Sequence, residues 1–406
     1  MVCQKSKVND WVEHFREHYE NERPFCLIHD LTKTKVKDIN SSLLKWCKDA
    51  EEHAFPHVYV INYDLLWRRP ELKKLKDFTL MLDESSLIQN ENSKRSRFIL
   101  GLKPQNVILL SGTPTGGKYE LLWSQLHLLG WKISKELYWN QYVDTHYEDV
   151  NGFPLRVIDG YKNVDRLKRK MRQYGCHFLK TEEVMDLPDQ VNERVYVMPS
   201  KEYQKFRKDR IVTLGGKWVD YCDELGNMQQ EFRGGKELVG DTTLTKLLYE
   251  RQLCGIYNWE KLKAFKDLVE STNDRLIVFY NFTAEMQMMQ EILMSEDFGY
   301  HVRFSVVNGS DKHLQNYEER SDSITFIQYQ AGAMGLNLQK ACRIIYFTPP
   351  LSSELYEQSK KRIHRIGQKS TCFYYHLICR GSVEERIYEN LRMRKDYTEA
   401  LFEADQ

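Results

Sequence analysis

The stretch Phe78–Ser86, "FTLMLDESS", decides the fold class of this 406-residue chain. Mostly apolar residues run directly into two adjacent carboxylates, Asp83 and Glu84. In a parallel sheet, ligands collect outside the carboxyl ends of the strands. The pattern therefore predicts a buried strand ending in a carboxylate pair that can hold Mg²⁺ and orient a water molecule. Taken alone, a strand that ends in an acidic turn is the simpler interpretation.

Short apolar runs of this kind recur along the chain and alternate with amphipathic segments. Continuous apolar strands separated by helices indicate parallel sheets buried on both faces. The pattern occurs twice, so we predict an α/β protein with two such lobes. The expected strands are 25–29, 58–62, 78–82, 107–110, 275–280, 303–307, 324–328, 343–347 and 371–378, and the expected helices are 10–19, 119–129, 283–294, 353–366 and 383–394.

The middle of the chain has a different composition, with polar, glycine-containing stretches such as "TLGGKWVDYCDELGN". We therefore expect three parts: a first lobe at 1–175, a linker and helical insertion at 176–257, and a second lobe at 258–406.

Composition excludes several classes of protein. The 59 basic and 58 acidic residues give a net charge of +1, so any nucleic-acid contact must come from a local cleft and not from overall charge. The apolar runs are too short to span a bilayer and no leader-like segment opens the chain, so we expect a cytoplasmic protein without membrane contact. Nine cysteines without a C-x-x-C pair indicate reduced core thiols.

The segment 352–368, "SSELYEQSKKRIHRIGQ", reads as a capped helix. Gln358, Arg362 and Arg365 are spaced i, i+4, i+7 and would share one helix face. Two guanidinium groups that face one cleft suit the negative charge of a phosphoryl-transfer transition state. A basic face exposed to solvent is the alternative interpretation.

A third segment, "IQYQAGAMGLNLQ" at 327–339, predicts a strand that enters a glycine turn. Small residues allow a backbone to approach a phosphate or a partner lobe closely. By itself the pattern indicates only a turn.

The order of these segments resembles that of superfamily 2 helicases, and the chain resembles the Swi/Snf-type family of DNA-dependent ATPases from residue 2 to about residue 395. The pieces that carry the resemblance are "VCQKSKVNDW" (motif Ia), "VINYD" (Ib), "LDESSLIQNENSK" (II), "LLSGTP" (III), "LIVFYNFTAEM" (IV), "AGAMGLNL" (V) and "EQSKKRIHRIGQ" (VI). "FLKTEEVMDLP" resembles the family's linker between lobes, and the compact size is similar to phage or prophage members.

The resemblance implies two RecA-like lobes with ATP between them and translocation on duplex DNA. Asp83 and Glu84 would coordinate Mg²⁺ and activate water, and Arg362 and Arg365 would stabilise the transferred phosphoryl group. The resemblance also assigns contacts to the nucleotide and to DNA phosphates. The nucleotide contacts are Gly335, Asn337 and Gln368, and the DNA contacts are Lys5, Ser6, Asn62, Ser111, Thr113 and Ser310.

The stretch "SGTPTGGKY" at 111–119 comes close to the phosphate-binding loop G-x-x-x-x-G-K-[ST] but is not one. Tyr119 stands where the loop needs a hydroxyl for Mg²⁺, and Pro114 removes a backbone donor. The stretch also follows the acidic strand, whereas the loop precedes it in this class. No other G-K-[ST] occurs in the sequence, so the resemblance assigns 111–119 to motif III.

The true loop, called Walker A, would precede motif Ia, which begins at residue 2. We therefore expect a first lobe truncated at its N-terminus, without its first strand, loop and helix. We expect the absent strand to lie inside the sheet, where each unpaired backbone group would cost roughly 1–3 kcal/mol. An incomplete chain is therefore favoured over an evolved inactive enzyme.

Three departures from the family pattern bear on the site. Ser85 and Ser86 replace the usual Gly-His, which puts the link from motif II to motif III in doubt. "QYQAGA" replaces "STRAGG", and Lys361 stands where Asp is common.

Two other functions stay open from sequence: a non-catalytic DNA-binding module and one half of a split ATPase. A nuclease has little support, although a nuclease, a methylase or a Walker A-bearing segment could be encoded separately.

Overall fold

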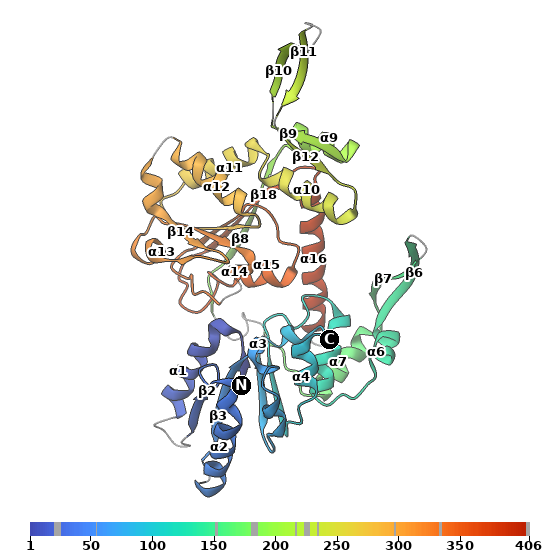
Figure 1. The fold of residues 1–406 in the computed structure, drawn as a ribbon, viewed down its shortest axis with the longest axis vertical. Coiled ribbons are helices and arrows are strands. Elements are labelled where there is room, and N and C mark those ends of the chain that lie inside the picture. Colours follow the sequence, from blue (N-terminus) through green and yellow to red (C-terminus); the bar gives the residue numbers. More distant parts are fainter. Residues whose placement is uncertain are drawn as a thin grey trace. The chain divides into compact units, whose positions relative to one another are not determined.

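The computed structural model describes residues 1–19, 26–53, 55–150, 153–179, 186–215, 217–222, 228–233, 235–295, 298–332 and 335–402 (Figure 1). The chain forms two compact units. The first comprises Met1–Glu183 together with Met393–Gln406, and the second comprises Val184–Arg392. None of the described helices is both long enough and apolar enough to cross a membrane.

The first unit is built on a parallel five-stranded sheet in the order β2-β3-β1-β4-β5. The central strand β1 is short, and its two residues point to opposite faces. Val2 packs with Ile61 and Leu82 on one face, whereas Cys3 packs with Val12 on the other. The strands are β1 (Val2–Cys3), β2 (Leu27–Asp30), β3 (His57–Asn62), β4 (Thr79–Asp83) and β5 (Asn106–Leu110).

Helices cover both faces of this sheet, as predicted for parallel strands. Helix α1 (Val8–Tyr19) buries Val8 and Val12 against the face that carries Cys3. Helices α2 (Ile39–His53) and α4 (Lys94–Leu100) contribute to the apolar cluster on the other face. The short helical elements are η1 (Lys5–Lys7), η2 (Val36–Asp38), α3 (Tyr63–Leu66), η3 (Pro70–Lys74), η4 (Ser85–Ile88) and η5 (Tyr119–Leu121).

Strand β5 lies at the edge of the sheet, and its sequence "NVILL" is apolar but incompletely covered. Ile108 is 45% exposed and Leu110 is 37% exposed. The described strands form a continuous ladder from β2 to β5. The prediction that a strand is absent from the inside of this sheet is therefore wrong for the described strands. The open ladder position lies at the outer side of β5, because the described strands pair β5 only with β4.

The rest of the first unit packs around a separate aromatic cluster that includes Trp131, Tyr138 and Tyr142. Its elements are α5 (Trp123–Leu128), α6 (Lys135–Tyr142), the antiparallel hairpin of β6 (Val143–Val150) and β7 (Phe153–Tyr161), and α7 (Val164–Gln173).

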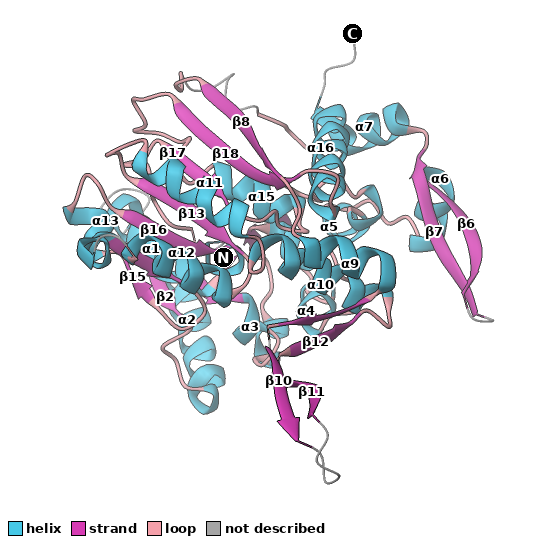
Figure 2. Ribbon diagram, turned by 90° about the horizontal axis from the view of Figure 1, so that it is seen from above, coloured by secondary structure: helices cyan, strands magenta, loops and turns pink. Residues whose placement is uncertain are grey.

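The second unit contains a seven-stranded sheet in the order β15-β14-β16-β13-β17-β18-β8, parallel except for β15 (Figure 2). The central strand β13, "LIVFY", is buried along its whole length. The strands are β8 (Gln190–Val197), β13 (Leu276–Tyr280), β14 (Phe304–Val307), β15 (Lys312–His313), β16 (Ile324–Gln328), β17 (Arg343–Tyr346) and β18 (Cys372–Cys379).

Helices also lie on both faces of the second sheet. Helices α11 (Trp259–Glu270) and α12 (Thr283–Met294) pack on the face that includes Val278, and the helices on the other face bury Phe279. The remaining helices are α9 (Lys201–Asp209), α10 (Thr243–Gly255), η6 (Phe298–Arg303), α13 (Gln315–Glu319), α14 (Tyr329–Gly332), α15 (Ser353–Lys360) and α16 (Val383–Phe402), of which α16 belongs to the second unit only as far as Arg392.

Residues 176–257 differ from the expected linker and helical insertion. Strand β8 joins the sheet of the second unit beside β18, and the unit begins at Val184, not at 258. The segment also holds two antiparallel pairs. Strand β9 (Ile211–Leu214) pairs with β12 (Lys236–Val239), and β10 (Lys217–Cys222) pairs with β11 (Met228–Arg233). Because β8 is a largely exposed edge strand, it lacks the apolar run that marks buried strands.

Candidate functional site

The carboxylates Asp83 and Glu84 lie at the carboxyl end of β4, as the sequence predicts. The Trp11 indole Nε1 donates a hydrogen bond to Asp83 Oδ2 at 2.9 Å. The Tyr63 hydroxyl donates to the backbone oxygen of Asp83 at 2.9 Å. Burial raises the pKa of Tyr63, so this hydroxyl stays a protonated donor. Two aromatic side chains therefore fix the end of β4 from α1 and from the start of α3.

Glu84 has a left-handed backbone conformation, with φ 57° and ψ 60°. This region is uncommon for a residue with a Cβ atom, and such strain persists where the surroundings impose it. The Ser111 hydroxyl donates to Glu84 Oε1 at 2.7 Å, and the Ser86 hydroxyl donates to the same oxygen at 2.9 Å. The side chain of Glu84 is thus held by two hydroxyl groups.

The link between segments 83–86 and 111–115, which the sequence left in doubt, is made without a histidine. The Ser85 hydroxyl donates to Gln125 Oε1 at 2.8 Å, and the Gln125 amide donates to the backbone oxygen of Pro114 at 2.7 Å. The Gln89 amide donates to the same oxygen at 3.0 Å. Pro114 is therefore an acceptor at the centre of this network and not part of a loop that presents donors.

The residues present fit a magnesium ion. Mg²⁺ prefers hard oxygen ligands such as carboxylates and keeps several waters. Asp83 Oδ2 accepts the hydrogen bond from Trp11, so Oδ1 of the same carboxylate is the oxygen that would bind a cation or its bound water. Glu84 lies next to Asp83, and its hydrogen bonds to Ser86 and Ser111 are to hydroxyl groups that do not neutralise its charge.

The sequence-predicted DNA contacts in the first unit gather at one edge of the sheet. Parallel strands end at the same side, so β1, β3, β4 and β5 bring Lys5, Asn62, Asp83 and Ser111 to that edge. Lys5 and the neighbouring Ser6 are exposed.

Asn62 and Thr113 are buried at this edge of the sheet, with 3% and 6% of their surface exposed. Among the described residues, Asn62 Oδ1 and Thr113 Oγ1 have no hydrogen-bond partner. Buried polar atoms are normally satisfied, so these two orphaned atoms are exceptions to that rule at this edge of the sheet.

In the second unit, Asn337 and Arg365 are hydrogen-bonded to each other, Arg365 Nη1 donating to Asn337 Oδ1. The Gln368 amide donates to the backbone oxygens of Gln339 and Ala341, the latter at 2.8 Å. Motifs V and VI are therefore joined at this point. Gly335 has φ 68°, a left-handed conformation that glycine adopts readily. Ala333 and Met334 of the same motif lie outside the described residues.

The predicted helix over 353–366 is too long. Helix α15 ends at Lys360, so Arg362 and Arg365 lie in the turns that follow and do not share a helix face with Gln358. The reason is the burial of Ile363, which is 0% exposed. Its side chain anchors the turn in the core, and the Arg362 backbone oxygen accepts from Leu338 N at 3.1 Å.

Ser310, the DNA contact predicted in the second unit, is exposed in the turn between β14 and β15. Its hydroxyl bonds to Asn308 Oδ1 at 3.1 Å and to Asp311 Oδ2 at 3.3 Å. The observed contacts are those of an ordinary turn.

Glu285 is a buried acid in the first turn of α12, which follows β13, and the sequence did not single it out. Its Oε2 accepts hydrogen bonds from Asn281 N at 2.9 Å, Phe282 N at 3.1 Å and Thr348 Oγ1 at 3.0 Å. Burial raises the pKa of this carboxyl to about 7. The sequence does contain a signal for this role of Glu285, because a Glu at the third position of a helix commonly caps the start of that helix.

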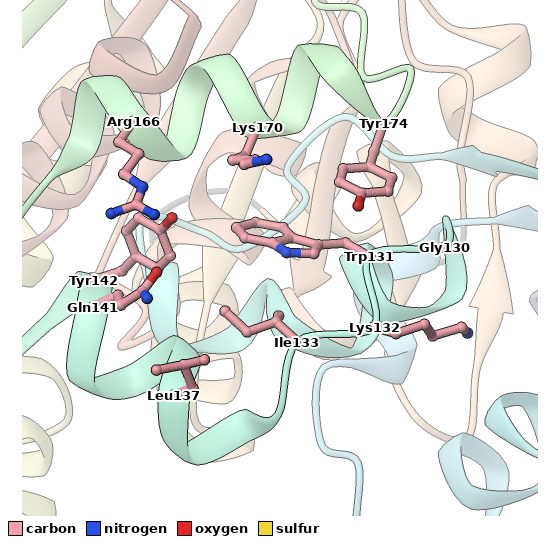
Figure 3. Close-up of a pocket in the computed structure, with 10 residues that line it drawn as sticks. All are labelled: Gly130, Trp131, Lys132, Ile133, Leu137, Gln141, Tyr142, Arg166, Lys170 and Tyr174. Carbon is pink, nitrogen blue, oxygen red and sulfur yellow. The ribbon is translucent and has the colours of Figure 1, made fainter.

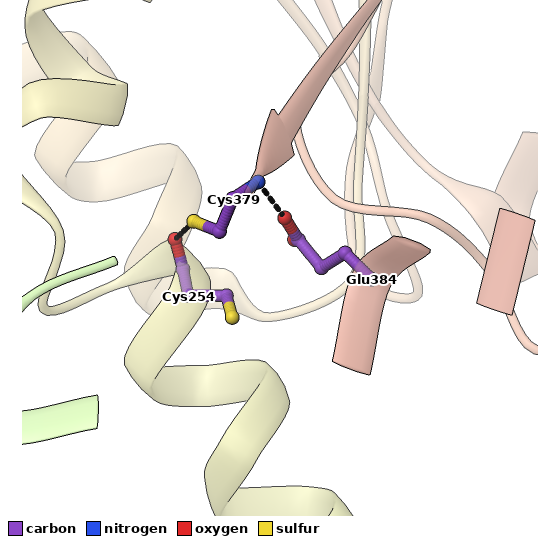
Figure 4. A group of neighbouring side chains, drawn as sticks. All are labelled: Cys254, Cys379 and Glu384. Atoms are coloured by element: carbon purple, nitrogen blue, oxygen red, sulfur yellow. Dashed lines mark hydrogen bonds between the residues drawn. The ribbon is translucent and has the colours of Figure 1, made fainter. Parts of the chain in front are cut away.

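Cys254, Cys379 and Glu384 bring three possible metal-ligating atoms together in the core of the second unit (Figure 4). A cation already occupies this position. The ammonium of Lys261 lies 2.6 and 2.7 Å from the two Glu384 oxygens, and both side chains are 0% exposed. Burial has the largest single effect and lowers the pKa of Lys261, but the attraction of Glu384 together with its hydrogen bond and the neighbouring Cys379 and Cys254 outweighs burial, so the pKa is raised. The cluster is therefore a buried ion pair.

The thiols of this cluster support the same interpretation. Burial raises the pKa of the Cys254 thiol well above its usual value, whereas a metal ligand is a thiolate. The Cys379 sulfur approaches the backbone oxygen of Cys254 at 3.5 Å, as a weak donor would (Figure 4).

Comparison with protein families agrees with this arrangement. The family described as "SNF2-related domain" matches residues 1–255, and the "Helicase conserved C-terminal domain" matches residues 260–367. The chain belongs to the SNF2-related family. The Swi/Snf-type resemblance predicted from the motifs is thus confirmed, and the parallel α/β sheets of both units fit the RecA-like lobes expected for an SNF2-related chain.

Curated relatives of this SNF2-related chain act in chromatin according to their names. It is 22% identical, over 97% of its length, to mouse SWI/SNF-related matrix-associated actin-dependent regulator of chromatin subfamily A member 1. It is also 22% identical, over 96% of its length, to the ISWI chromatin-remodeling complex ATPase ISW1 of Saccharomyces cerevisiae. The chain covers only 37% and 34% of these proteins.

One solved structure, the C-terminal part of the Fun30 ATPase domain, matches 53% of the chain and 98% of its own length, with 14% identity and a TM-score of 0.35.

Proposed function

We propose that this SNF2-related chain is the motor of an ATP-hydrolysing translocase that acts on duplex DNA. The observation that carries the proposal is the hydrogen bond from Ser111 to Glu84, which joins the acidic end of β4 to the segment after β5. A carboxylate held in this way can orient an attacking water. The alternative uses of the acidic pair, as a surface turn or a structural cap, do not account for the strained backbone of Glu84.

The roles proposed in hydrolysis follow from chemistry. Asp83 would hold Mg²⁺, which neutralises phosphate charge when bound. Glu84 would orient the attacking water and accept its proton. Arg362 and Arg365 would supply positive charge to the transferred phosphoryl group. Nucleotide contacts from Gly335, Asn337 and Gln368 stay part of the proposal, and the bond from Arg365 to Asn337 supports it by placing one of these residues next to a proposed catalytic arginine.

The proposed hydrolysis requires a loop that holds the phosphates of ATP. No G-K-[ST] occurs in the 406 residues. We propose that a further polypeptide segment adds a parallel strand to the open side of β5 and carries this loop. The exposed apolar side chains of Ile108 and Leu110 support an additional strand there, because parallel strands are normally buried on both faces.

DNA contact is proposed for Lys5, Ser6, Asn62, Ser111 and Thr113, which lie at one edge of the first sheet, and for Ser310. Contacts of such residue types go mainly to phosphate groups and carry little sequence information. Similarity to phage-encoded members and a separately encoded nuclease or methylase partner stay predictions.

The test is ATP hydrolysis by the chain expressed together with the coding sequence immediately 5′ of its Met1 codon, with and without duplex DNA. We expect DNA-stimulated release of phosphate that Glu84→Gln abolishes. The matched control is Glu13→Gln, an exposed carboxylate on α1, which should leave the rate unchanged.

A second outcome would favour the non-catalytic DNA-binding module. In that case the same preparation binds duplex DNA with strong salt dependence but hydrolyses no ATP. That result would overturn the proposed hydrolysis.

A further inference from the structure

A pocket of about 470 Å³ in the first unit has no role in the proposed hydrolysis (Figure 3). We call it the basic pocket. Its walls come from α6, from α7 and from residues 130–133 between α5 and α6. The residues that line it are Gly130, Trp131, Lys132, Ile133, Leu137, Gln141, Tyr142, Arg166, Lys170 and Tyr174.

The charge of the basic pocket is of one sign. Three of the lining residues are cationic, Lys132, Arg166 and Lys170, and none is acidic. Arg166 and Lys170 are spaced i, i+4 on α7 and point toward the pocket from the same helix face (Figure 3). No described carboxylate forms an ion pair with Arg166, and Lys170 bonds only to the neutral Gln173 amide, at 2.9 Å. This charge favours an anionic ligand.

The floor of the basic pocket is rigid. The rings of Trp131 and Tyr174 stack with centroids 5.8 Å apart and an interplanar angle of 9°. Trp131 also meets Tyr138 and Tyr142 edge to face, at 6.1 and 5.9 Å. A pocket built on packed aromatic rings keeps its shape in the absence of a ligand, which lowers the entropic cost of binding.

Tyr142 supplies an unsatisfied polar group. The side chain is 0% exposed, and its hydroxyl has no hydrogen-bond partner among the described residues. Figure 3 shows this hydroxyl directed toward α7, beside the Arg166 guanidinium. Buried hydroxyl groups are normally paired, so this orphaned hydroxyl marks the position of a missing acceptor, and the exposed Arg166 guanidinium beside it adds positive charge there.

An apolar wall lies opposite this polar corner. Leu137 on α6 is 49% exposed, and Ile133 beside it is half-buried. A phosphate backbone would not bury this apolar surface. An aliphatic or aromatic side chain would bury it, with a favourable free energy of roughly 25 cal/mol per Å² of apolar surface removed from water. The ligand therefore carries an anion and an apolar group side by side.

We propose that the basic pocket docks a short acidic segment of a partner polypeptide. A carboxylate accepts hydrogen bonds from Arg166 and from the Tyr142 hydroxyl, and a neighbouring apolar side chain packs between Ile133 and Leu137. The volume accommodates a few residues. Charge complementarity, the orphaned hydroxyl and the exposed leucine all favour this occupant over a nucleic-acid strand.

The experiment measures fluorescence anisotropy of labelled octapeptides with the 406-residue chain. In each peptide an Asp, a Glu or a terminal carboxylate is placed next to Leu, Ile, Phe or Trp, and a counterpart carries the corresponding amide. A labelled dT12 oligonucleotide is the nucleic-acid probe. We expect acidic peptides to bind at least tenfold more tightly than their amide counterparts.

Variants of the lining residues locate the binding. Arg166→Glu should weaken binding of the acidic peptides at least tenfold, and Leu137→Ser about fivefold. The matched control is Arg169→Glu, which makes the same charge change on the exposed side of α7 and should alter binding less than twofold. Tyr142→Phe should weaken binding several-fold without lowering the urea midpoint of unfolding, because its hydroxyl bonds nothing in the free chain.

Two results would overturn the proposal. In the first, no acidic peptide prefers the unchanged chain over Arg166→Glu. In the second, binding of dT12 depends on Arg166 and Tyr142 whereas peptide binding does not, and the pocket is then a nucleic-acid contact.

Discussion

The Ser111 hydroxyl donates a hydrogen bond to Glu84 Oε1 at 2.7 Å, although 27 residues separate the two in sequence. The bond joins the ends of the neighbouring strands β4 and β5. It couples the carboxylate proposed to activate water to a segment proposed to contact DNA. If both proposed roles hold, a change at the proposed DNA contact reaches the proposed catalytic carboxylate through one hydroxyl group.

The first prediction concerns this bond. Ser111→Ala should slow DNA-stimulated ATP hydrolysis about tenfold with little change in the KM for ATP, because a hydrogen bond to a charged group is worth roughly 1.5–3 kcal/mol. Ser41→Ala, at an exposed serine on α2, is the control. Equal rates for Ser111→Ala and the unchanged protein would show that Glu84 is positioned by other contacts.

The second prediction concerns the buried ion pair of Lys261 and Glu384. Lys261→Met should lower the free energy of unfolding by about 3–5 kcal/mol, because it leaves a buried carboxylate without its partner. Adding Glu384→Gln should recover much of this loss, since the amide oxygen can still accept from Cys379 N. The control is Arg392→Met in the exposed pair with Glu389, which should change the free energy of unfolding far less, because water screens exposed ion pairs.

Urea unfolding measures these free energies. If Lys261→Met alone is as stable as the double variant, Glu384 carries no charge in the folded protein, and the two groups do not form a buried ion pair.

The third prediction is a pH dependence set by Glu285. Its pKa is raised to about 7 by burial, so the folded chain holds a proton that the unfolded chain releases near pH 4.5. The stabilisation is therefore complete below about pH 4.5 and is lost as the pH rises through 7, a change on the order of 3 kcal/mol. Glu285→Gln removes this titration.

The measurement compares the unchanged chain with Glu285→Gln in urea at pH 5 and at pH 8. We expect the variant to gain stability relative to the unchanged chain at pH 8. A difference that is the same at both pH values would contradict a raised pKa at Glu285.

The fourth prediction concerns Gly255 at the end of α10. A Cβ atom there would lie 2.2 Å from Glu285 Oε1 and 3.0 Å from Thr348 Cγ2. Gly255→Ala should therefore destabilise the protein by about 1–3 kcal/mol through overpacking. Gly309→Ala is the matched control, because a Cβ atom at Gly309 meets nothing within 4 Å. Thermal unfolding of both variants tests the difference, and equal melting temperatures would show that the Glu285 side chain can move aside.

Much of the fold was predictable because burial leaves a local pattern in sequence. The strand predicted at 275–280 is β13, and helix α12 has the bounds 283–294 that its periodicity indicated. Strands without a buried run were missed. Strand β1 has only two residues, and the polar strand β8 lies at an edge. Helix α15 was overextended because the burial of Ile363 outweighs local helix propensity.

The candidate site was predictable in part for the same reason. The acids Asp83 and Glu84 stand out because they follow an apolar run. The side chains that hold these acids do not stand out in the sequence. Trp11, for example, bonds to Asp83 although the two are 72 residues apart. Contacts of this kind depend on which strands become neighbours, and no spacing rule reports that.

The sequence by itself determined two α/β lobes, the acidic strand end and the order of the motifs, because each depends on residues close together in the chain. Only the tertiary structure decided that β5 is an open edge, that serines hold Glu84 and that the cluster around Cys254 is an ion pair with Lys261. The reason is physical. Local periodicity reflects which residues are buried, whereas strand order and side-chain partners follow from the free energy of packing segments that are distant in sequence.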